Sequence, residues 1–179
     1  MSGAESVPVI VLGIDPGLAS TGFGVVASER TATGAERLRA LDRGVIATDA
    51  GAPPEARLAQ IHARVDALLR AHAPDSMALE ELYFGQNART AFAVGQGRGA
   101  AMLAAGQRMV PCASYTPQQV KSAVCGSGRA GKQQVSRMVA LLLGLSGEPA
   151  SDHAADALAV AVCHANTAPR SRTLAEAMR

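Results

Sequence analysis

Apolar positions follow two kinds of pattern along the chain, and the first kind is typical of β-strands. Short runs that are continuous, or that alternate with small or polar residues, cover residues 9–14, 21–27, 38–48, 77–82 and 110–113. The first run is uninterrupted, as expected for a central strand that is buried on both faces. Pro16-Gly17 ends it, and the second run is expected to pair with it as a hairpin.

Helical periodicity separates and follows these runs. Pro53-Pro54 opens a helix that continues to His72, with apolar residues three or four positions apart. Thr116 is expected to cap a further helix that has Pro117 at its first position. Other helices are predicted over residues 87–105, 132–143 and 152–165. Three leading strands followed by alternating helices and strands predict a mixed five-stranded α/β sheet flanked by helices.

Length and composition limit the possible organisation. With 179 residues, 48% of them hydrophobic, the chain can build one domain with a substantial core. We expect this domain over residues 1–166 and a flexible C-terminal tail over residues 167–179. Three cysteines without CxxC spacing predict a reduced, cytoplasmic protein. We expect no membrane association, since no signal-peptide pattern and no membrane-spanning apolar run is present.

The net charge of +2 hides an uneven distribution of charged residues. From Leu82 to Gly147 there is no Asp or Glu, whereas seven basic residues fall in this stretch. A solvated basic face explains such a stretch as well as a polyanionic ligand does. Its position between two acidic motifs favours nucleic acid as the ligand.

Acidic residues stand next to apolar runs in three motifs that are far apart in the sequence. Asp15 follows the first strand, Glu80-Glu81 lies in the fourth run, and Ser-Asp-His-Ala-Ala-Asp at 151–156 opens the last helix, with Ser151 as its expected cap. Carboxylates at the edge of a core are costly to desolvate, and converging carboxylates repel one another. A divalent cation removes both penalties, and hard oxygen ligands favour Mg²⁺ or Mn²⁺ over Zn²⁺. The pattern therefore predicts a metal-dependent enzyme.

Each acidic motif also has a purely structural interpretation. Asp-Pro-Gly forms a turn on its own. Adjacent glutamates often mark a solvated strand edge, although Glu80 and Glu81 point to opposite faces. Asp152 and Asp156 could compensate the helix dipole, which accounts for Asp152 better than for Asp156, deeper in an apolar helix.

The glycine-rich stretch Gly-Ser-Gly-Arg-Ala-Gly-Lys at 126–132 matches both GxGxxG and GxxxxGK. It lacks the context of a nucleotide-binding loop, because Gln133 follows the lysine where Ser or Thr is needed, and a helix rather than a strand precedes it. A basic loop that holds Arg129 and Lys132 against a phosphate backbone needs neither feature.

Taken together, five segments resemble the RuvC family of Holliday-junction resolvases in order and spacing. They are GIDPGLASTGFGVV, ALEELYFGQNARTAFAVGQGRGA, TPQQVKSAV, GSGRAGKQQV and SDHAADALAVAVCH, and the resemblance extends from Val9 to His164. It implies a ribonuclease H-like fold and a crossover junction endodeoxyribonuclease that acts in DNA recombination and repair. It also implies a homodimer, paired symmetric nicking of four-way DNA junctions with two Mg²⁺ or Mn²⁺ ions per site, and a branch-migration complex as partner.

The resemblance also implies roles for individual residues. Asp15 and Glu80 match the family's first two catalytic acids, and Lys121 and Lys132 match basic residues near the scissile phosphate. Lys132 is expected to neutralise charge on the phosphoryl oxygens. Tyr83 matches an aromatic residue that would stack on a base. The charge of the acid-free stretch adds Arg89, Arg98 and Arg129, so the expected DNA-binding residues are Tyr83, Arg89, Arg98, Lys121, Arg129 and Lys132.

The last motif departs from the family. The first of its two ligand positions commonly holds Asp, but here it is His153, with Asp156 as the second. A neutral imidazole can also bind a metal ion, so the expected ligands are Asp15, Glu80, His153 and Asp156. Asp152 is the alternative to His153 as the metal ligand at this position. Adjacent residues differ by about 100° around a helix, so we expect only one of the two to face the ion.

Two other functions compete with nuclease activity. An actin-like sugar kinase also begins with a Gly-x-Asp-x-Gly hairpin, although such kinases are normally about twice as long as this chain, and ATP turnover would reveal one. A junction-binding protein without activity could share the fold. The intact acidic positions argue against it, and a metal-dependent nicking assay would decide.

Overall fold

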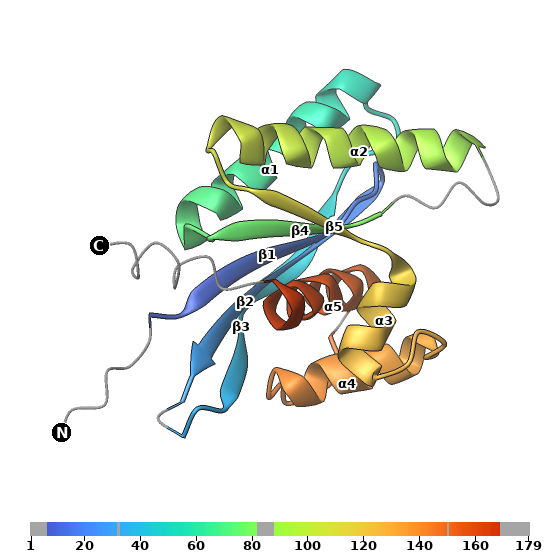
Figure 1. Ribbon diagram of the computed structural model, residues 1–179. Coiled ribbons are helices and arrows are strands. Elements are labelled where there is room, and N and C mark those ends of the chain that lie inside the picture. Colours follow the sequence, from blue (N-terminus) through green and yellow to red (C-terminus); the bar gives the residue numbers. More distant parts are fainter. Residues whose placement is uncertain (1–6, 32, 82–87, 150, 169–179) are drawn as a thin grey trace.

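The computed structural model describes residues 7–31, 33–81, 88–149 and 151–168. In these residues a mixed sheet is covered by helices on both faces (Figure 1). The elements are, in order, β1 (Val9–Asp15), β2 (Ser20–Arg30), β3 (Glu36–Ala47), α1 (Pro54–His72), β4 (Ser76–Glu80), α2 (Ala88–Gln107), β5 (Cys112–Tyr115), α3 (Pro117–Cys125), α4 (Lys132–Leu142) and α5 (Asp152–Thr167).

The described strands form a five-stranded sheet in the order β3-β2-β1-β4-β5, which confirms the predicted mixed sheet. β2 is antiparallel to both of its neighbours, β1 and β3, whereas β4 runs parallel to both β1 and β5. The register places Ile14 beside Leu79. Asp15 and Glu80, the next residues, therefore lie at the carboxyl ends of adjacent parallel strands, an edge where α/β folds commonly place their sites.

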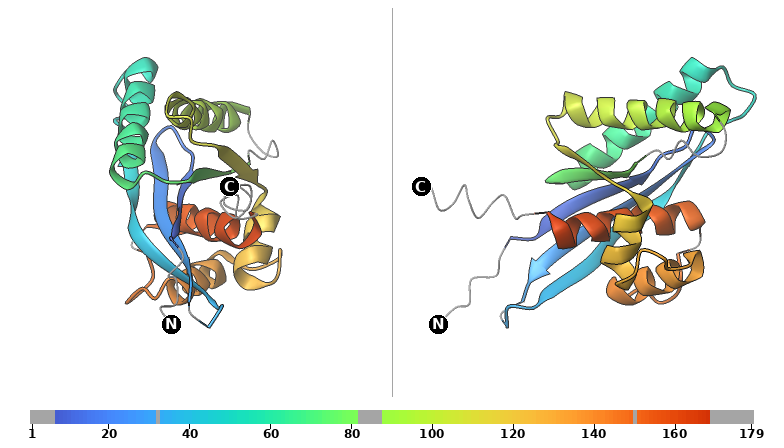
Figure 2. Two further views of the ribbon diagram at one scale, coloured as in Figure 1. Left: turned by 60° about the vertical axis from the view of Figure 1, so that its left-hand side comes forward. Right: turned by 45° about the vertical axis from the view of Figure 1, so that its right-hand side comes forward.

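Successive residues of the central strands face two separate cores. Val11, Val26 and Ala78 pack with α3, α4 and α5 on one face, whereas Leu12, Val25 and their neighbours pack with α1 and α2 on the other. The two helical layers can be followed on either side of the sheet in Figure 2. Burial on both faces explains why the first apolar run is continuous.

Glycines in β1 and β2 allow α5 to approach the sheet closely. A Cβ on Gly13 would lie 2.0 Å from the Ala157 carbonyl oxygen, and one on Gly22 would lie 2.0 Å from the His153 carbonyl oxygen. Both positions therefore require glycine while α5 keeps its place. Gly22 is also the ladder partner of Asp15, so this contact brings the start of α5 to the end of β1.

Several predicted boundaries differ from those observed. β5 begins at Cys112 rather than at Val110, because Pro111 offers only its carbonyl oxygen to Met77 N–H. Thr116 forms the expected cap, as part of a capping box with Gln119. Ser151 has the extended backbone of an N-cap, but its side chain makes no capping hydrogen bond.

The predicted tail is largely outside the described residues. α5 continues to Thr167, one residue beyond the expected end of the domain, and residues 169–179 are not described. Among the helices that are described, none combines the length and the apolar character needed to cross a membrane.

Candidate active site

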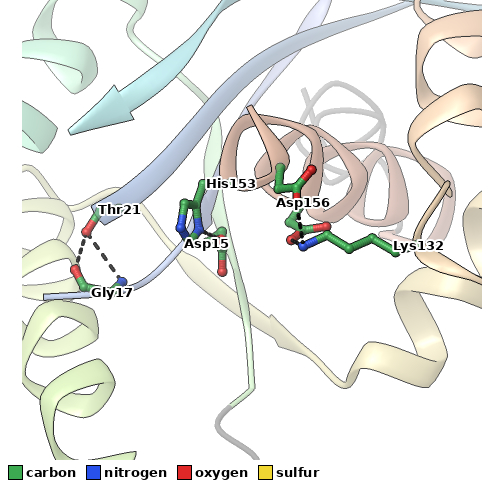
Figure 3. Close-up of polar contacts among 7 residues, drawn as sticks. Asp15, Gly17, Thr21, Lys132, His153 and Asp156 are labelled. Atoms are coloured by element: carbon green, nitrogen blue, oxygen red, sulfur yellow. Dashed lines mark hydrogen bonds and ion pairs between the residues drawn. The ribbon is translucent and has the colours of Figure 1, made fainter. Parts of the chain in front are cut away.

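Asp15 and His153 bring the end of β1 and the first turn of α5 into contact. His153 Nδ1 donates to Asp15 Oδ2 over 2.7 Å, as Figure 3 shows. The Asp15 side chain is 17% exposed, whereas that of His153 is 50% exposed. The sequence-predicted partners from opposite ends of the chain therefore meet at the rim of the sheet.

The turn after Asp15 is fixed by a buried threonine. Thr21 Oγ1 donates to the Gly17 carbonyl oxygen over 2.6 Å, and Gly17 N–H lies 3.4 Å from the same Oγ1 (Figure 3). Thr21 is fully buried. The structural and functional interpretations of Asp-Pro-Gly are thus compatible, since the turn itself holds the carboxylate at the site.

Three carboxyl groups at the site have raised pKa values. Burial, followed by the negative charges of Asp15 and Asp156, raises the pKa of Glu80 to about 7. Burial is also the main cause that raises the pKa of Asp15 and of Asp156 above their usual values, against the opposing effects of His153 and Lys132. The raised values show that nearby positive charge does not compensate these carboxylates fully.

Lys132 enters the acidic site from the first turn of α4. Its Nζ lies 3.1 Å from Asp152 Oδ2 and 3.5 Å from Asp156 Oδ2, and the Asp156 contact is drawn in Figure 3. Hydrogen bonding to Asp152 is the main cause that raises the Lys132 pKa. Asp152 itself is 78% exposed, so its pairing with Lys132 is largely solvated and contributes little stability.

A cleft of about 220 Å³ adjoins these groups. Its polar lining is provided by Glu80, Lys121, Lys132 and Asp156, and its apolar lining by Pro117, Val120, Val135, Ala159 and Val160. Lys121, which the family resemblance places near the scissile phosphate, lines this cleft. The two carboxyl groups can bind a cation, and the two lysines can bind an anionic group beside it.

The donor set can be tested for its fit to a metal ion. As the side chains lie, no three His, Cys, Asp or Glu side chains in the described part of the chain are gathered around one point. Asp15 is engaged with His153, and Asp156 with Lys132. The carboxylate oxygens nevertheless match the ligands that Mg²⁺ or Mn²⁺ prefers, and a neutral imidazole nitrogen can also bind a metal ion. The raised carboxyl pKa values show that added positive charge would be stabilising there, so the residues fit.

The remaining basic candidates occupy different positions. Arg89 and Arg129 are exposed, on α2 and in the glycine-rich loop. Arg98 instead donates within the protein, to the Glu80 carbonyl oxygen and to Ser114 Oγ. Tyr83 lies outside the described residues.

Sequence reasoning missed the inward bonding of Arg98, as it did a second polar cluster far from the site. His164 lies 2.8 Å from the Tyr115 hydroxyl oxygen through Nδ1 and 2.9 Å from Ser76 Oγ through Nε2. No spacing in the sequence indicates either arrangement, because the partners come from different elements.

The chain is similar to known proteins along most of its length. The family model described as crossover junction endodeoxyribonuclease RuvC matches residues 11–164. The RuvC of Moorella thermoacetica is 51% identical over 161 residues, which is 90% of this chain and 93% of the relative. That of Thermomicrobium roseum is 51% identical over 154 residues, covering 86% of this chain and 91% of the relative.

Solved structures agree with this similarity. The Thermus thermophilus RuvC structure has a TM-score of 0.83 at 42% identity and covers 89% of this chain and 95% of its own. The same protein in complex with Holliday junction substrate has a TM-score of 0.83 at 41% identity, over 89% of this chain and 94% of its own. The yeast mitochondrial Holliday junction resolvase Ydc2, at 15% identity and a TM-score of 0.56, shares the fold.

Fold, site and relatives together define a nuclease with a ribonuclease H-like fold. The chain belongs to the RuvC family of crossover junction endodeoxyribonucleases. Membership implies dependence on a divalent metal ion. The predicted fold class and family are confirmed, whereas the roles of individual site residues stay predictions.

Proposed function

We propose that the protein resolves four-way (Holliday) DNA junctions in recombination and repair, by paired and symmetric nicking of two strands. The observation that carries this proposal is that Asp15, Glu80 and Asp156 lie near enough for the charges of Asp15 and Asp156 to raise the pKa of Glu80, beside a cleft that contains Lys121 and Lys132. A relative that binds Holliday junction substrate in a solved structure supports the choice of DNA.

Asp15, Glu80, His153 and Asp156 are the proposed ligands of two Mg²⁺ or Mn²⁺ ions. The contact between His153 and Asp15 supports this set, since it shows that α5 reaches the end of β1. When bound, such ions activate a water molecule and stabilise the leaving oxygen of a phosphodiester. The four side chains supply negative charge and orientation, and the buried Thr21 turn keeps Asp15 at the strand end.

Lys132 is proposed to act on the phosphate that reacts. Its present partners, Asp152 and Asp156, lie on the first two turns of α5, next to the proposed metal ligands. Because the Asp152 contact is exposed, a phosphoryl oxygen can replace it at little cost. Lys132 then neutralises charge that accumulates on the phosphoryl oxygens, while Asp152 holds the ammonium group in place before DNA binds.

The basic stretch supports binding to DNA along its backbone. Residues 82–147 lack acidic side chains, and the exposed Arg89 and Arg129 lie in that stretch. Contacts of this kind position DNA without reading its sequence, and they make affinity fall steeply with salt.

A homodimer is proposed because two symmetric cuts need two sites. On α2, Phe92 and Leu103 are 69% and 57% exposed. Gly99 and Gly106 recur on the same face, and a Cβ on either would meet no other atom. This face allows a second helix to approach closely, so we propose α2 as the dimer surface. The branch-migration complex and the cytoplasm are the proposed partner and location, by family membership.

Competition binding and cleavage test the proposal together. We expect the protein to bind a synthetic four-way junction at least about tenfold more tightly than a linear duplex of the same sequence at physiological salt, with affinity that falls steeply as salt rises. The junction, and not the duplex, is cut when Mg²⁺ or Mn²⁺ is added. Selective binding without cutting would instead identify a non-catalytic junction-binding protein.

A further inference from the structure

Arg98, in the middle of α2, holds the end of the strand that carries Glu80. Its Nη1 donates to the Glu80 carbonyl oxygen over 2.9 Å, and its Nη2 donates to Ser114 Oγ over 2.6 Å. One guanidinium group therefore binds β4 and β5 at once. A planar guanidinium with fixed donors is suited to hold two acceptors in a defined relative position.

The position of this clamp matters because the β4 strand ends at Glu80. The next amide, Glu81 N–H, still donates to the Tyr115 carbonyl oxygen over 2.8 Å. Arg98 binds the carbonyl of the same peptide unit, so both polar groups of the Glu80–Glu81 peptide are fixed. Fixing that peptide plane fixes the backbone of Glu80, and with it the direction in which the carboxyl side chain leaves the strand.

The residue before Arg98 contacts the second acidic strand end. Gly97 is buried, and a Cβ placed on it would lie 2.8 Å from the Gly17 carbonyl oxygen. That carbonyl accepts from Thr21 in the turn after Asp15. Two consecutive residues of α2 thus contact the chain just after Asp15 and just after Glu80.

We propose that Arg98 is a positioning residue for Glu80, which holds the end of β4 so that the two acids face one another, rather than a residue that binds DNA. The inference rests on the proposed function, because it concerns the same acidic site. It replaces the expectation, drawn from charge alone, that Arg98 contacts the phosphate backbone.

The test compares Arg98→Met, which removes both donors, with wild type in single-turnover cleavage of a four-way junction. Junction affinity is measured in EDTA across a range of salt concentrations. We expect cleavage to slow about 10- to 100-fold, since small misplacements of reacting groups have effects of that order. Affinity and its salt dependence stay within about twofold of wild type, because no phosphate contact is lost. Arg98→Lys, which keeps one donor, restores part of the rate.

Two comparison variants separate positioning from other roles. Arg108→Met removes an arginine that follows the last residue of α2 and is bonded to Asp66. We expect this variant to cleave at the wild-type rate. Arg89→Met removes an exposed charge from the first turn of α2. We expect it to lower the affinity for the junction and to make that affinity less dependent on salt concentration. Mn²⁺ binding to the DNA-free protein, measured by calorimetry, should weaken in Arg98→Met and not in Arg108→Met.

The outcomes distinguish this inference from the proposed function. If wild type does not cut the junction, the proposed function fails and the inference fails with it. If wild type cuts and Arg98→Met cuts equally fast, or loses affinity and salt dependence as Arg89→Met does, only the inference is overturned. Should Arg98→Met not fold, Ser114→Ala decides, because it removes one acceptor of the clamp: we expect slower cleavage at unchanged affinity, and an unchanged rate would refute the clamp.

Discussion

The folded protein places the Glu80 side chain in surroundings that disfavour its charged form, because the carboxyl group is partly buried and lies near Asp15 and Asp156. Its pKa of about 7 lies above the usual value of 4.5. The charged carboxylate therefore destabilises the fold fully above pH 7, less between pH 7 and 4.5, and not below 4.5. Glu80→Gln should raise the melting temperature of the metal-free protein at pH 8, by roughly 2–4 °C for each kcal/mol relieved. It should also abolish cleavage and spare junction binding.

The neighbouring residue provides the control. Glu81 is exposed, so Glu81→Gln should leave melting temperature and cleavage unchanged. Calorimetry in EDTA, followed by a cleavage assay, measures both effects. A Glu80→Gln protein that cuts at the wild-type rate would remove Glu80 from the catalytic site. A Glu80→Gln protein that melts at a lower temperature than wild type would show that the Glu80 charge does not destabilise the fold.

His153 contacts an acidic residue and Asp152 contacts a basic one, and this difference distinguishes their predicted roles. His153 is bonded to Asp15, whereas Asp152 is directed at Lys132. His153→Ala should therefore slow cleavage by about 100-fold or more, as expected for the loss of a group that acts at the reacting centre. His153→Asp should keep a working site with a changed preference between Mg²⁺ and Mn²⁺, because a carboxylate is the harder ligand.

Asp152→Asn is the matched variant at the adjacent position. We expect it to lower the cleavage rate only a few-fold, since it loses a solvated partner of Lys132. Rates measured with each metal ion decide between the two residues. A fully active His153→Ala together with an inactive Asp152→Asn would show that the ligand is Asp152.

At the scale of elements, the sequence predicted local patterns well and contacts between elements poorly. The uninterrupted run before Asp15 identified β1, and Thr116-Pro117 identified the start of α3. Each depends on residues that are close in sequence. Arg98 shows the limit: its charge indicated a DNA contact, but the acceptors that it finds lie on β4 and β5.

The close approach of α5 to the sheet was also hidden in the sequence. The sequence shows only that Gly13 and Gly22 lie within predicted strands, and glycine in a strand is a weak indication of close packing. Their partners, Ala157 and His153, are more than a hundred positions away. The acidic motifs could be found from their neighbours in the chain, but their convergence follows from this packing.

His164 joins α5 to β4 and β5 through Ser76 and Tyr115. Burial lowers its pKa below the usual value of 6.5, so folding favours the neutral ring. Its contribution to stability is therefore complete above about pH 6.5 and is lost progressively as the pH falls below that value. The free energy of unfolding of wild type should fall between pH 7 and pH 5.5 relative to that of His164→Gln, which does not titrate.

Denaturant unfolding at several pH values measures this difference, and the titrating carboxyl groups cancel because both proteins contain them. At pH 7.5 the loss of two partly buried hydrogen bonds should cost His164→Gln about 1–2 kcal/mol. Parallel curves for wild type and His164→Gln would contradict the lowered pKa.

At the scale of the whole molecule, the exposed face of α2 should decide the oligomeric state. Leu103→Glu places a charge on that face, and burying it in an interface is costly. We expect light scattering to show a dimer for wild type and a monomer for Leu103→Glu at micromolar concentration. Met109→Glu, at an exposed residue just after α2, should stay dimeric. A dimeric Leu103→Glu would place the interface elsewhere.

The most direct test of the account maps the cuts in a synthetic four-way junction with each strand labelled in turn. Wild type and Asp15→Asn are incubated with Mg²⁺, with Mn²⁺ or with EDTA. If the acidic site at the ends of β1 and β4 is the catalytic centre of a dimeric resolvase, wild type should nick two strands at symmetric positions, and only when a divalent ion is present. Asp15→Asn should bind the junction without cutting it. Cutting in EDTA, cutting by Asp15→Asn at the wild-type rate, or no cutting by wild type with either ion would contradict the account.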